Sequence, residues 1–457
     1  MGVMHDSLSA ALNLSGARPA LRDSRAVRQQ IDSIVRLAVF GTAEEQALAR
    51  FAIHAAAAEL GAPASSIAGL YAARGRGEVS GFTVPAVNIR GMAYDMSRAL
   101  FRAMKSTGAA ATVFELARSE MGYTFQEPAE LAAVVLGAAI AEDYVGPVFI
   151  QGDHFQANAK KFSTDPEGET EALEDLIRKA VAAQFYCIDI DASTLVDLSF
   201  EKVADQQHPN ASLTARLAKL VRELEPQGVT ISIGGEIGEV GKNNSTVDEL
   251  TSYVDGFRAM VGPDFEFEGI SKVSVQTGTS HGGIPLPDGT IASVAIDFET
   301  LRELSQVSRD RYGMAGAVQH GASTLPDELF HRFPTVDTAE IHLATGFQNI
   351  MLDHSVFPSD LLAEMRSYAD RDLADERKAG ETDSQFFYKT RKKVWGPYKQ
   401  QTWDLPADCR AVLGGALESK FEFLIRQLKA NDTREITLRY VTHQPVEVEP
   451  PTLAVRA

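Results

Sequence analysis

Eight short β-rich runs alternate with segments of helical periodicity from Gly81 onward. In chain order they are FTVPAVNI, AATVFEL, PVFIQGD, YCIDIDAS, VTISIGGEI, KVSVQTGTS, AGAVQH and AEIHLATG. Strands that alternate with helices are typical of a parallel sheet with crossover helices. Eight such units favour a closed sheet over an open one, so the sequence predicts an α/β fold, a TIM (β/α)8 barrel.

The predicted barrel leaves long flanking segments in the 457 residues. Residues 1–79 lack strand-like runs and contain TAEEQALARFAIHAAAAEL, in which Thr42 can cap a helix, so we expect a helical N-terminal extension. Residues 80–355 would form the barrel with its catalytic site. Residues 356–457 predict additional helices followed by a short strand-like tail, REITLRYVTH. Because no fixed-period repeat is present, we expect one elaborated barrel.

Charge and composition narrow the possible partners. A formal net charge of −18 argues against binding to nucleic acid or to an anionic membrane, since both need a basic face. No apolar run approaches the roughly 20 residues of a membrane helix, and no signal peptide is evident, so the expected location is cytoplasmic. The two cysteines, Cys187 and Cys409, are too few for a disulfide framework and are expected to be reduced.

Basic residues cluster in the segment FFYKTRKKVWGPYK. One interpretation of this cluster is a solvated helix face. The alternatives are a contact for a phosphate group or for another subunit.

Three histidines stand at the downstream ends of three strand-like runs: His154 in FIQGDHF, His281 in VQTGTSHGG and His320 in AVQHGAST. Side chains at the carboxyl ends of barrel strands converge on one mouth. Three imidazoles with an open fourth position suit a catalytic zinc ion better than a structural one. The sequence therefore predicts a metalloenzyme.

Carboxylates follow the same strand ends. Asp191 and Glu236 either cap the next helix or hold a second divalent ion or a substrate hydroxyl. Asp153 precedes His154, and in a regular strand the two side chains would point to opposite faces. Its place in the site thus depends on a twist at the strand end; if it faces the substrate, it can donate or accept a proton.

Glycines and hydroxyls accompany two of the histidines. Gly282 follows His281, and Gly321 follows His320 with Ser323 close behind. Backbone amides in such turns can cradle an anion without positive side chains. A phosphate ligand is therefore compatible with the negative net charge.

Four motifs recur in an order that resembles the class II, zinc-dependent fructose-bisphosphate aldolase family. They are GDH at 152–154, EIGEVG at 236–241, GTSHGG at 278–283 and HGAS at 320–323. FTVPAVNI, which ends near Asn88, is similar to the family's A-x-N strand, and IHLATG resembles its N-I-x-T segment. The resemblance spans residues from about 80 to 350.

The resemblance implies a metal site and a proton-transfer group. The zinc would be bound by His154, His281 and His320, with Glu236 and Asp191 at an alternative metal or substrate-hydroxyl position. A second divalent position and a nearby monovalent cation are also implied as possibilities. Asp153 would shuttle a proton to the aldehyde oxygen of the acceptor.

It also implies how a dihydroxyacetone-phosphate-like donor is bound. The phosphate would be held by Gly282, Gly321, Ser323 and Thr345. Asn88 and His342 would contact the substrate.

The sequence departs from the family where the family's mobile loop carries a glutamate base. Asn243 and Asn244 stand at about that place, so Asp248 or Glu249 is expected to substitute.

Further departures surround the expected phosphate site. Ile284 and Pro285 replace the family's tyrosine and lysine, Ala322 replaces a glycine, and His342 replaces an asparagine. Arg391 in the basic segment is expected to supply the distal phosphate contact.

The leading hypothesis is a zinc-dependent aldolase of carbohydrate metabolism that reversibly cleaves a phosphorylated ketose, by default the glycolytic fructose 1,6-bisphosphate. The alternatives are an aldolase for another sugar phosphate, a barrel metallohydrolase that uses zinc hydroxide, and a metal-binding homologue without catalysis. The expected partner is a small sugar phosphate, and the family resemblance predicts a homo-oligomer.

Overall fold

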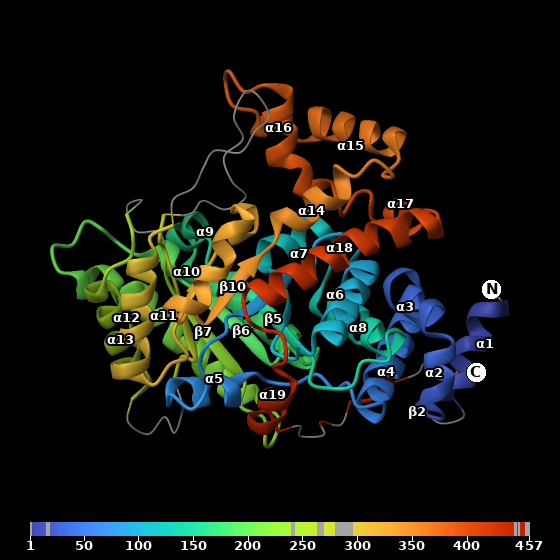
Figure 1. Cartoon of the computed structure of the whole chain (residues 1–457), viewed down its shortest axis with the longest axis horizontal. Helices are drawn as coiled ribbons and strands as arrows, with labels where there is room; N and C mark the ends of the chain where they lie inside the picture. The colour runs from blue at the N-terminus through green and yellow to red at the C-terminus, as the bar shows by residue number, and fades with distance from the viewer. Residues whose placement is uncertain are drawn as a thin grey trace.

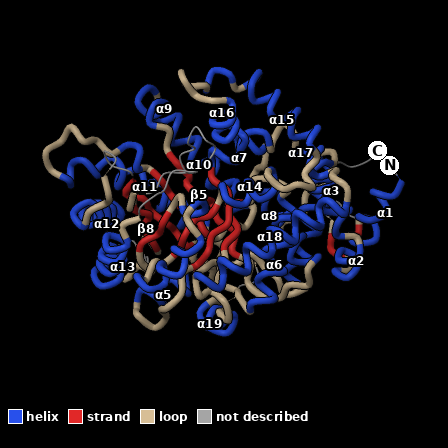
Figure 2. The backbone as a smooth tube through the Cα atoms, turned by 45° about the horizontal axis from the view of Figure 1, so that its top comes forward, coloured by secondary structure: helices blue, strands red, loops and turns tan. Residues whose placement is uncertain are grey.

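The computed structural model describes residues 2–14, 19–238, 243–262, 269–278, 296–442, 446 and 448–452. Its centre is a barrel of parallel strands (Figures 1 and 2). The barrel is closed, in the strand order β10-β3-β4-β5-β6-β7-β8-β9. The strands are β3 (Val84–Asn88), β4 (Val113–Ala117), β5 (Phe149–Gln156), β6 (Cys187–Asp191), β7 (Ser232–Gly238), β8 (Lys272–Val275), β9 (Ala317–Gln319) and β10 (Glu340–Leu343). Each strand overlaps one of the eight predicted runs, so the predicted TIM barrel is confirmed.

Helices connect the strands and cover the outside of the barrel (Figure 1). They are α6 (Ala93–Thr107), α7 (Arg118–Thr124), α8 (Pro128–Ala141), α9 (Ala159–Thr164), α10 (Pro166–Ala182), α11 (Val203–Leu224), α12 (Val247–Val261), α13 (Phe298–Tyr312) and α14 (Thr345–Leu352). Short 3-10 turns are η1 (Ser193–Leu195), η2 (Ala322–Thr324) and η3 (Asp327–Val336). In α10, for example, Leu173, Ile177 and Ala180 are buried along one helix face, as a covering helix requires.

The N-terminal extension is helical, as expected, but it also contains a small sheet. Its helices are α1 (Gly2–Ala11), α2 (Ser24–Gln29), α3 (Ile31–Phe40), α4 (Ala43–Glu59) and α5 (Ala68–Gly75). β1 (Leu12–Asn13) pairs antiparallel with β2 (Ala20–Leu21), so the prediction that residues 1–79 lack strands was wrong. Thr42 does cap α4, where it forms a capping box with Glu45.

Helix α8 joins the N-terminal extension to the barrel. Its sequence, PAELAAVVLGAAIA, is apolar nearly all round, and almost every residue is buried. Helices α3 and α4 pack on it from outside. Gly137 allows this close approach, because a Cβ at that position would lie 2.3 Å from Cγ2 of Val35. One continuous apolar core therefore runs from the extension into the barrel.

The C-terminal segment adds helices on two sides of the barrel. They are α15 (Ser359–Asp372), α16 (Asp383–Thr390), α17 (Lys399–Trp403), α18 (Ala407–Gln427) and α19 (Arg434–Tyr440), with the 3-10 turns η4 (Ala374–Glu376) and η5 (Arg391–Val394). Helix α18 packs along α6. Helices α15 and α16 project beyond the carboxyl ends of the strands, at the top of Figure 1.

Within the tail REITLRYVTH, Arg434–Tyr440 form helix α19, so the predicted strand there was wrong. Helix α19 packs against α5 at the opposite end of the barrel from α16 (Figure 1). Thr437 is fully buried, and the carbonyl oxygen of Tyr440 would lie 2.2 Å from a Cβ at Gly69. Tertiary packing therefore outweighs the β propensity of this segment.

The cysteines agree with the expectation of free thiols. Neither Cys187 nor Cys409 forms a disulfide. Across the described ranges, no helix has the length and apolarity needed to span a membrane.

Candidate metal centre

A cavity of about 970 Å³ opens at the carboxyl ends of the barrel strands. Residues after the strands form its floor and walls, and residues 378–392 cover part of it. Most residues expected in the active site line it: Asn88, Asp153, His154, Glu236, His320, Gly321, Ser323, His342 and Thr345. The structure thus brings together residues that lie far apart in the sequence.

An irregularity in β5 places both Asp153 and His154 in this cavity. The pairing of β5 with β6 shifts register between Gly152 and Phe155, and His154 has a left-handed backbone with φ of 42°. A regular strand would have sent the two side chains to opposite faces. A left-handed non-glycine residue costs on the order of 1–3 kcal/mol, and such strain is concentrated at functional sites.

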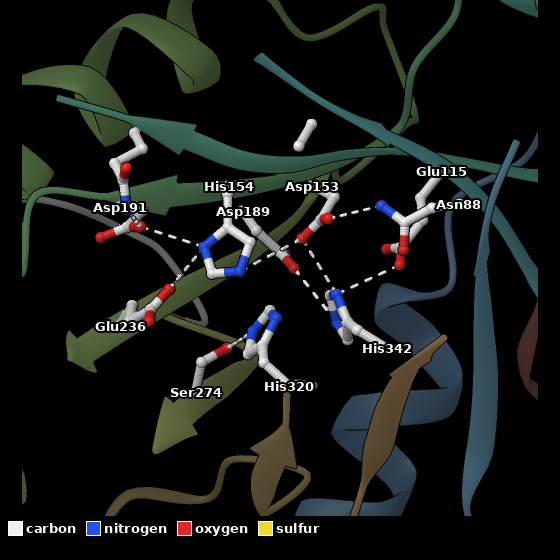
Figure 3. Close-up of polar contacts among 12 residues, drawn as sticks. Asn88, Glu115, Asp153, His154, Asp189, Asp191, Glu236, Ser274, His320 and His342 are labelled. Carbon is white, nitrogen blue, oxygen red and sulfur yellow. Dashed lines mark hydrogen bonds and ion pairs between the residues drawn. The ribbon is translucent and has the colours of Figure 1, made fainter. Parts of the chain in front are cut away.

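His154, Glu236 and His320 each offer a ligand atom, and these atoms lie within 4.8 Å of one another. The His154 and His320 ring centroids are 3.9 Å apart (Figure 3). Two ligands of a tetrahedral zinc ion, each 2.0–2.1 Å from it, stand about 3.4 Å apart, so a small inward movement of the side chains completes the site. Two imidazoles and a carboxylate are also a donor set that zinc prefers, so these residues fit a divalent metal ion.

Two other residues expected at this site, His281 and Gly282, lie outside the described residues.

Carboxylates surround His154 and make this part of the cavity anionic. Nδ1 of His154 lies 2.8 Å from Oε2 of Glu236 and 3.0 Å from Oδ2 of Asp191. Burial lowers the pKa of His154, but the charges of Glu236 and Asp153 and the hydrogen bond with Asp191 outweigh it and hold the pKa well above its usual value. Burial, followed by the charge of Asp191, raises the pKa of Glu236 to about 7. A cation in this place would be stabilised by the same carboxylates.

Asp153 is anchored from two sides (Figure 3). Nδ2 of Asn88 donates to one carboxylate oxygen at 2.7 Å, and Nδ1 of His342 lies 2.9 Å from the other. Burial raises the pKa of Asp153, but the charges of His154 and His342 and these hydrogen bonds outweigh it, so the pKa is well below the usual range. The structure therefore presents an oriented carboxylate to the cavity.

Beneath His342, the barrel interior contains a buried ionic network. Nε2 of His342 lies 2.7 Å from Oε1 of Glu340. The Nζ atom of Lys272 donates to the same oxygen, to Oδ2 of Asp189 at 2.9 Å and to Oε1 of Gln151 at 2.8 Å. Barrel interiors are usually filled by branched apolar side chains, so this network is unusual. This network was not predicted from the sequence.

The two glutamates in and beside this network have pKa values that are shifted in opposite directions. Burial raises the pKa of Glu340, but Lys272, His342 and Gln151 outweigh it and hold the pKa well below its usual range. Burial, together with the charge of Asp153, raises the pKa of Glu115 to about 8. Glu115, Glu340 and His342 also lie within metal-ligand distance of one another. The Lys272 ammonium group already supplies a cation there, so this group is structural.

The expected phosphate residues share one wall of the cavity. Gly321 has a left-handed backbone with φ of 70°, which suits a glycine, and opens the turn η2. Oγ of Ser323 accepts from the amide of Gly346 at 3.2 Å. Oγ1 of Thr345 accepts from Nη1 of Arg90 at 3.2 Å. These contacts place two hydroxyls and a guanidinium group beside the cavity.

The two carboxylates expected to replace the family's loop base do not line the cavity. Asp248 is exposed at the start of α12. The Glu249 carboxylate accepts from the amide and the hydroxyl of Thr246 in a capping box, at 2.7 and 2.9 Å. In this structure Glu249 caps a helix, and the assignment of the base to Asp248 or Glu249 stays a prediction.

The basic segment lies over the cavity, but Arg391 does not line it. Arg391 is buried, pairs with Asp353 at 2.7 Å and places its guanidinium carbon 4.5 Å from the Tyr388 ring centroid. Lys389 and Lys392 of the same segment do line the cavity. The distal phosphate contact of Arg391 stays a prediction, and the residues of this segment that line the cavity with positive charge are these two lysines.

Solved structures share this fold. A structure described as a probable tagatose 6 phosphate kinase from Sinorhizobium meliloti 1021 has 15% identity and a TM-score of 0.53, covering 72% of this chain and 87% of that chain. A fructuronate-tagaturonate epimerase from Cohnella laeviribosi has 13% identity and a TM-score of 0.50, covering 77% and 82%. Fructose-bisphosphate aldolase from Campylobacter jejuni has 17% identity and a TM-score of 0.47, covering 81% and 97%. At these identities the first two structures show a shared fold and nothing more.

No curated protein sequence matches the chain. The sequence model of the family described as fructose-bisphosphate aldolase class-II, however, matches residues 76–395. This match includes the whole barrel, the cavity residues and residues 386–395 of the basic segment. The chain therefore belongs to the class II fructose-bisphosphate aldolase family.

Proposed function

We propose that the protein is a zinc-dependent aldolase that reversibly cleaves a phosphorylated ketose, with fructose 1,6-bisphosphate as the default substrate. The products would be dihydroxyacetone phosphate and glyceraldehyde 3-phosphate. The observation that carries this proposal is the group of His154, Glu236 and His320 on the cavity floor, next to the anchored carboxylate of Asp153. When bound, the metal ion supplies a Lewis acid that stabilises negative charge developing on the donor's ketone oxygen.

The chain's own residues would hold that ion and keep its surroundings anionic. His154 and His320 supply nitrogen ligands and Glu236 an oxygen ligand, and His281 is proposed as a further ligand from outside the described residues. Asp191 accepts a hydrogen bond from Ser193 and lies beside His154, so it fixes the orientation of that imidazole.

Asp153 is proposed to move the proton of the acceptor's hydroxyl group. In the cleavage direction it accepts this proton as the aldehyde forms, and in the condensation direction it returns it. Its bonds to Asn88 and His342 leave acceptor capacity on the carboxylate, since each oxygen has two lone pairs. Because both partners are themselves buried, the carboxylate is held in one orientation.

The metal assignment is tested with chelator-stripped protein. Zinc is expected to restore triose phosphate release from fructose 1,6-bisphosphate. His320→Ala and His281→Ala are expected to lose bound zinc, measured by elemental analysis after gel filtration. Full zinc content and full activity in these variants would contradict the ligand assignment.

The role of Asp153 is tested separately. Asp153→Asn is expected to keep its zinc and to lose about 10²- to 10⁴-fold in kcat, the usual contribution of a proton-transfer group. Asp360→Asn, an exposed carboxylate outside the cavity, is the matched control and is expected to retain activity. If a panel of ketose phosphates yields no triose product with the wild-type protein, the proposed reaction is wrong.

The departures from the family motifs make an aldolase for another sugar phosphate the second candidate. His342 replaces the family's asparagine and contacts Asp153, which changes the groups around the reacting atoms. The same ketose phosphate panel identifies the preferred substrate by kcat/KM. A cytoplasmic location and a homo-oligomeric state stay predictions.

A further inference from the structure

Arg90 is a cation of the cavity wall to which the sequence assigned no role. It follows β3, is 13% exposed at its side chain and lines the cavity. Its Nη1 donates to Oγ1 of Thr345, the hydroxyl expected at the phosphate. The guanidinium group therefore lies beside the wall formed by Thr345, Ser323 and Gly321.

A carboxylate fixes the orientation of this guanidinium group. Nε and Nη2 of Arg90 both lie 2.5 Å from Oε1 of Glu120. The other oxygen of Glu120 accepts from Nδ2 of Asn88 at 2.8 Å and from the amide of Ala117 at 3.0 Å. These contacts use Nε, Nη1 and Nη2 once each, and arginine has five N–H donors. Two donors remain for a ligand in the cavity.

Lys392 adds a second cation to the same cavity. Within the part of the chain that the structure describes, its ammonium group has no hydrogen bond or ion pair; it lies 5.9 Å from the Tyr123 ring centroid. Burial lowers the pKa of Lys392, and the positive charge of Arg90 lowers it further, so the two cations act on each other. Glu120 and Glu376 offset part of this repulsion, and an anion bound between the two cations would offset more of it.

The number of donors and the charge define the anion. The two remaining N–H groups of Arg90, the ammonium of Lys392 and the hydroxyl of Thr345 exceed what the two oxygens of a carboxylate need. A phosphate monoester has three terminal oxygens and a charge of about −1.5 to −2. Arg90, Glu120 and Lys392 together carry a net charge of +1, which favours such a multivalent anion.

We propose that Arg90 and Lys392 form the cationic half of the phosphate subsite and bind the substrate's phosphate ester next to Thr345. Arg90 offers N–H donors in a fixed planar arrangement. Lys392 offers a movable point charge from the segment that covers the cavity. This inference depends on the proposed function only for the identity of the ester as a ketose phosphate.

The test compares a phosphorylated ligand with its neutral counterpart in the full-length, metal-loaded protein. Titration calorimetry measures Kd for dihydroxyacetone phosphate and for dihydroxyacetone. Arg90→Gln and Lys392→Gln are each expected to weaken binding of the phosphate by about 10- to 100-fold, the usual loss for a charged hydrogen bond, without weakening dihydroxyacetone. Lys160→Gln, an exposed lysine outside the cavity, is the charge-matched control.

Lys392→Gln keeps the test decisive if Arg90→Gln fails to fold, since it breaks no ion pair. Unchanged Kd values for dihydroxyacetone phosphate in the folded variants would overturn the inference, as would an equal loss for both ligands. If the phosphate-specific loss is observed but the wild-type protein cleaves no ketose phosphate, the subsite stands and the proposed function fails. If the wild-type protein cleaves a ketose phosphate but the variants bind the phosphate as tightly as the wild type, the proposed function stands and the subsite assignment fails.

Discussion

Replacement of Lys272 by methionine tests whether the buried network holds the barrel together. Lys272 is 1% exposed and donates to Asp189, Gln151 and Glu340. Methionine keeps much of the stem but leaves two buried carboxylates without their cation. Removing one partner of a buried ion pair costs about 3–5 kcal/mol, and we expect a decrease of this size in the free energy of unfolding.

The variant should also respond to pH in the opposite sense from the wild type. In the wild type the pKa of Glu340 is lowered, so its contribution to stability is present above the unfolded pKa and is lost only as the pH falls. Without Lys272, burial raises this pKa, so stability is greatest at low pH and is lost as the pH rises. Between pH 5 and 8 the loss approaches about 1.4 kcal/mol per pH unit for one such group.

The assay is urea unfolding followed by tryptophan fluorescence at several pH values. Lys160→Met is the exposed control, and Lys272→Met/Glu340→Gln is expected to recover part of the lost stability because it removes one uncompensated charge. A Lys272→Met variant within 1 kcal/mol of the wild type, with no dependence on pH, would refute the reasoning.

Three further predictions concern stability. Gly91→Ala should lower the free energy of unfolding by about 1–3 kcal/mol, because its Cβ would lie 2.2 Å from Cδ2 of the buried Trp395 ring. Urea unfolding measures this loss, and an unchanged urea midpoint would contradict the close packing. Burial lowers the pKa of His54, whose Nδ1 lies 2.9 Å from Oε1 of Gln184. The wild type should therefore lose stability as the pH falls below about 6.5. His54→Gln should abolish this pH dependence, measured by urea unfolding of both proteins at several pH values. Glu249→Ala should lower the free energy of unfolding by about 0.5–2 kcal/mol, because the helix cap is lost, while turnover is retained. Lost turnover with intact stability would instead support its assignment as the base.

The barrel was predictable because its signals are local. Each strand is a short apolar or β-branched run, and each connecting helix shows an apolar stripe, so eight repeats of this pattern define the closed sheet. Placement of the site followed from topology, since the carboxyl ends of parallel strands converge. His154, Glu236 and His320 meet for this reason.

The remaining features depend on contacts between distant segments. The bulge in β5 that turns both Asp153 and His154 into the cavity has no signal in the sequence GDHF. The helical tail is stabilised by packing against α5, which outweighs the preference of residues such as Ile436 and Thr437 for strands. The charged residues inside VFEL, CIDID, KVSV and EIHL were a signal of the buried network, because a charge within a barrel strand needs a partner inside.

Because α8 is packed on two sides, the protein cannot be shortened to the barrel without exposing one face of this helix. With the barrel on one side and α3 and α4 on the other, this helix has no polar face to turn toward water. A truncated chain that begins at residue 76, where the family match starts, would expose the apolar face of α8 around Gly137, which packs against Val35 and Ile31 of α3. Such a fragment would self-associate or require a substitute cover, so the N-terminal helices function as an integral wall of the molecule.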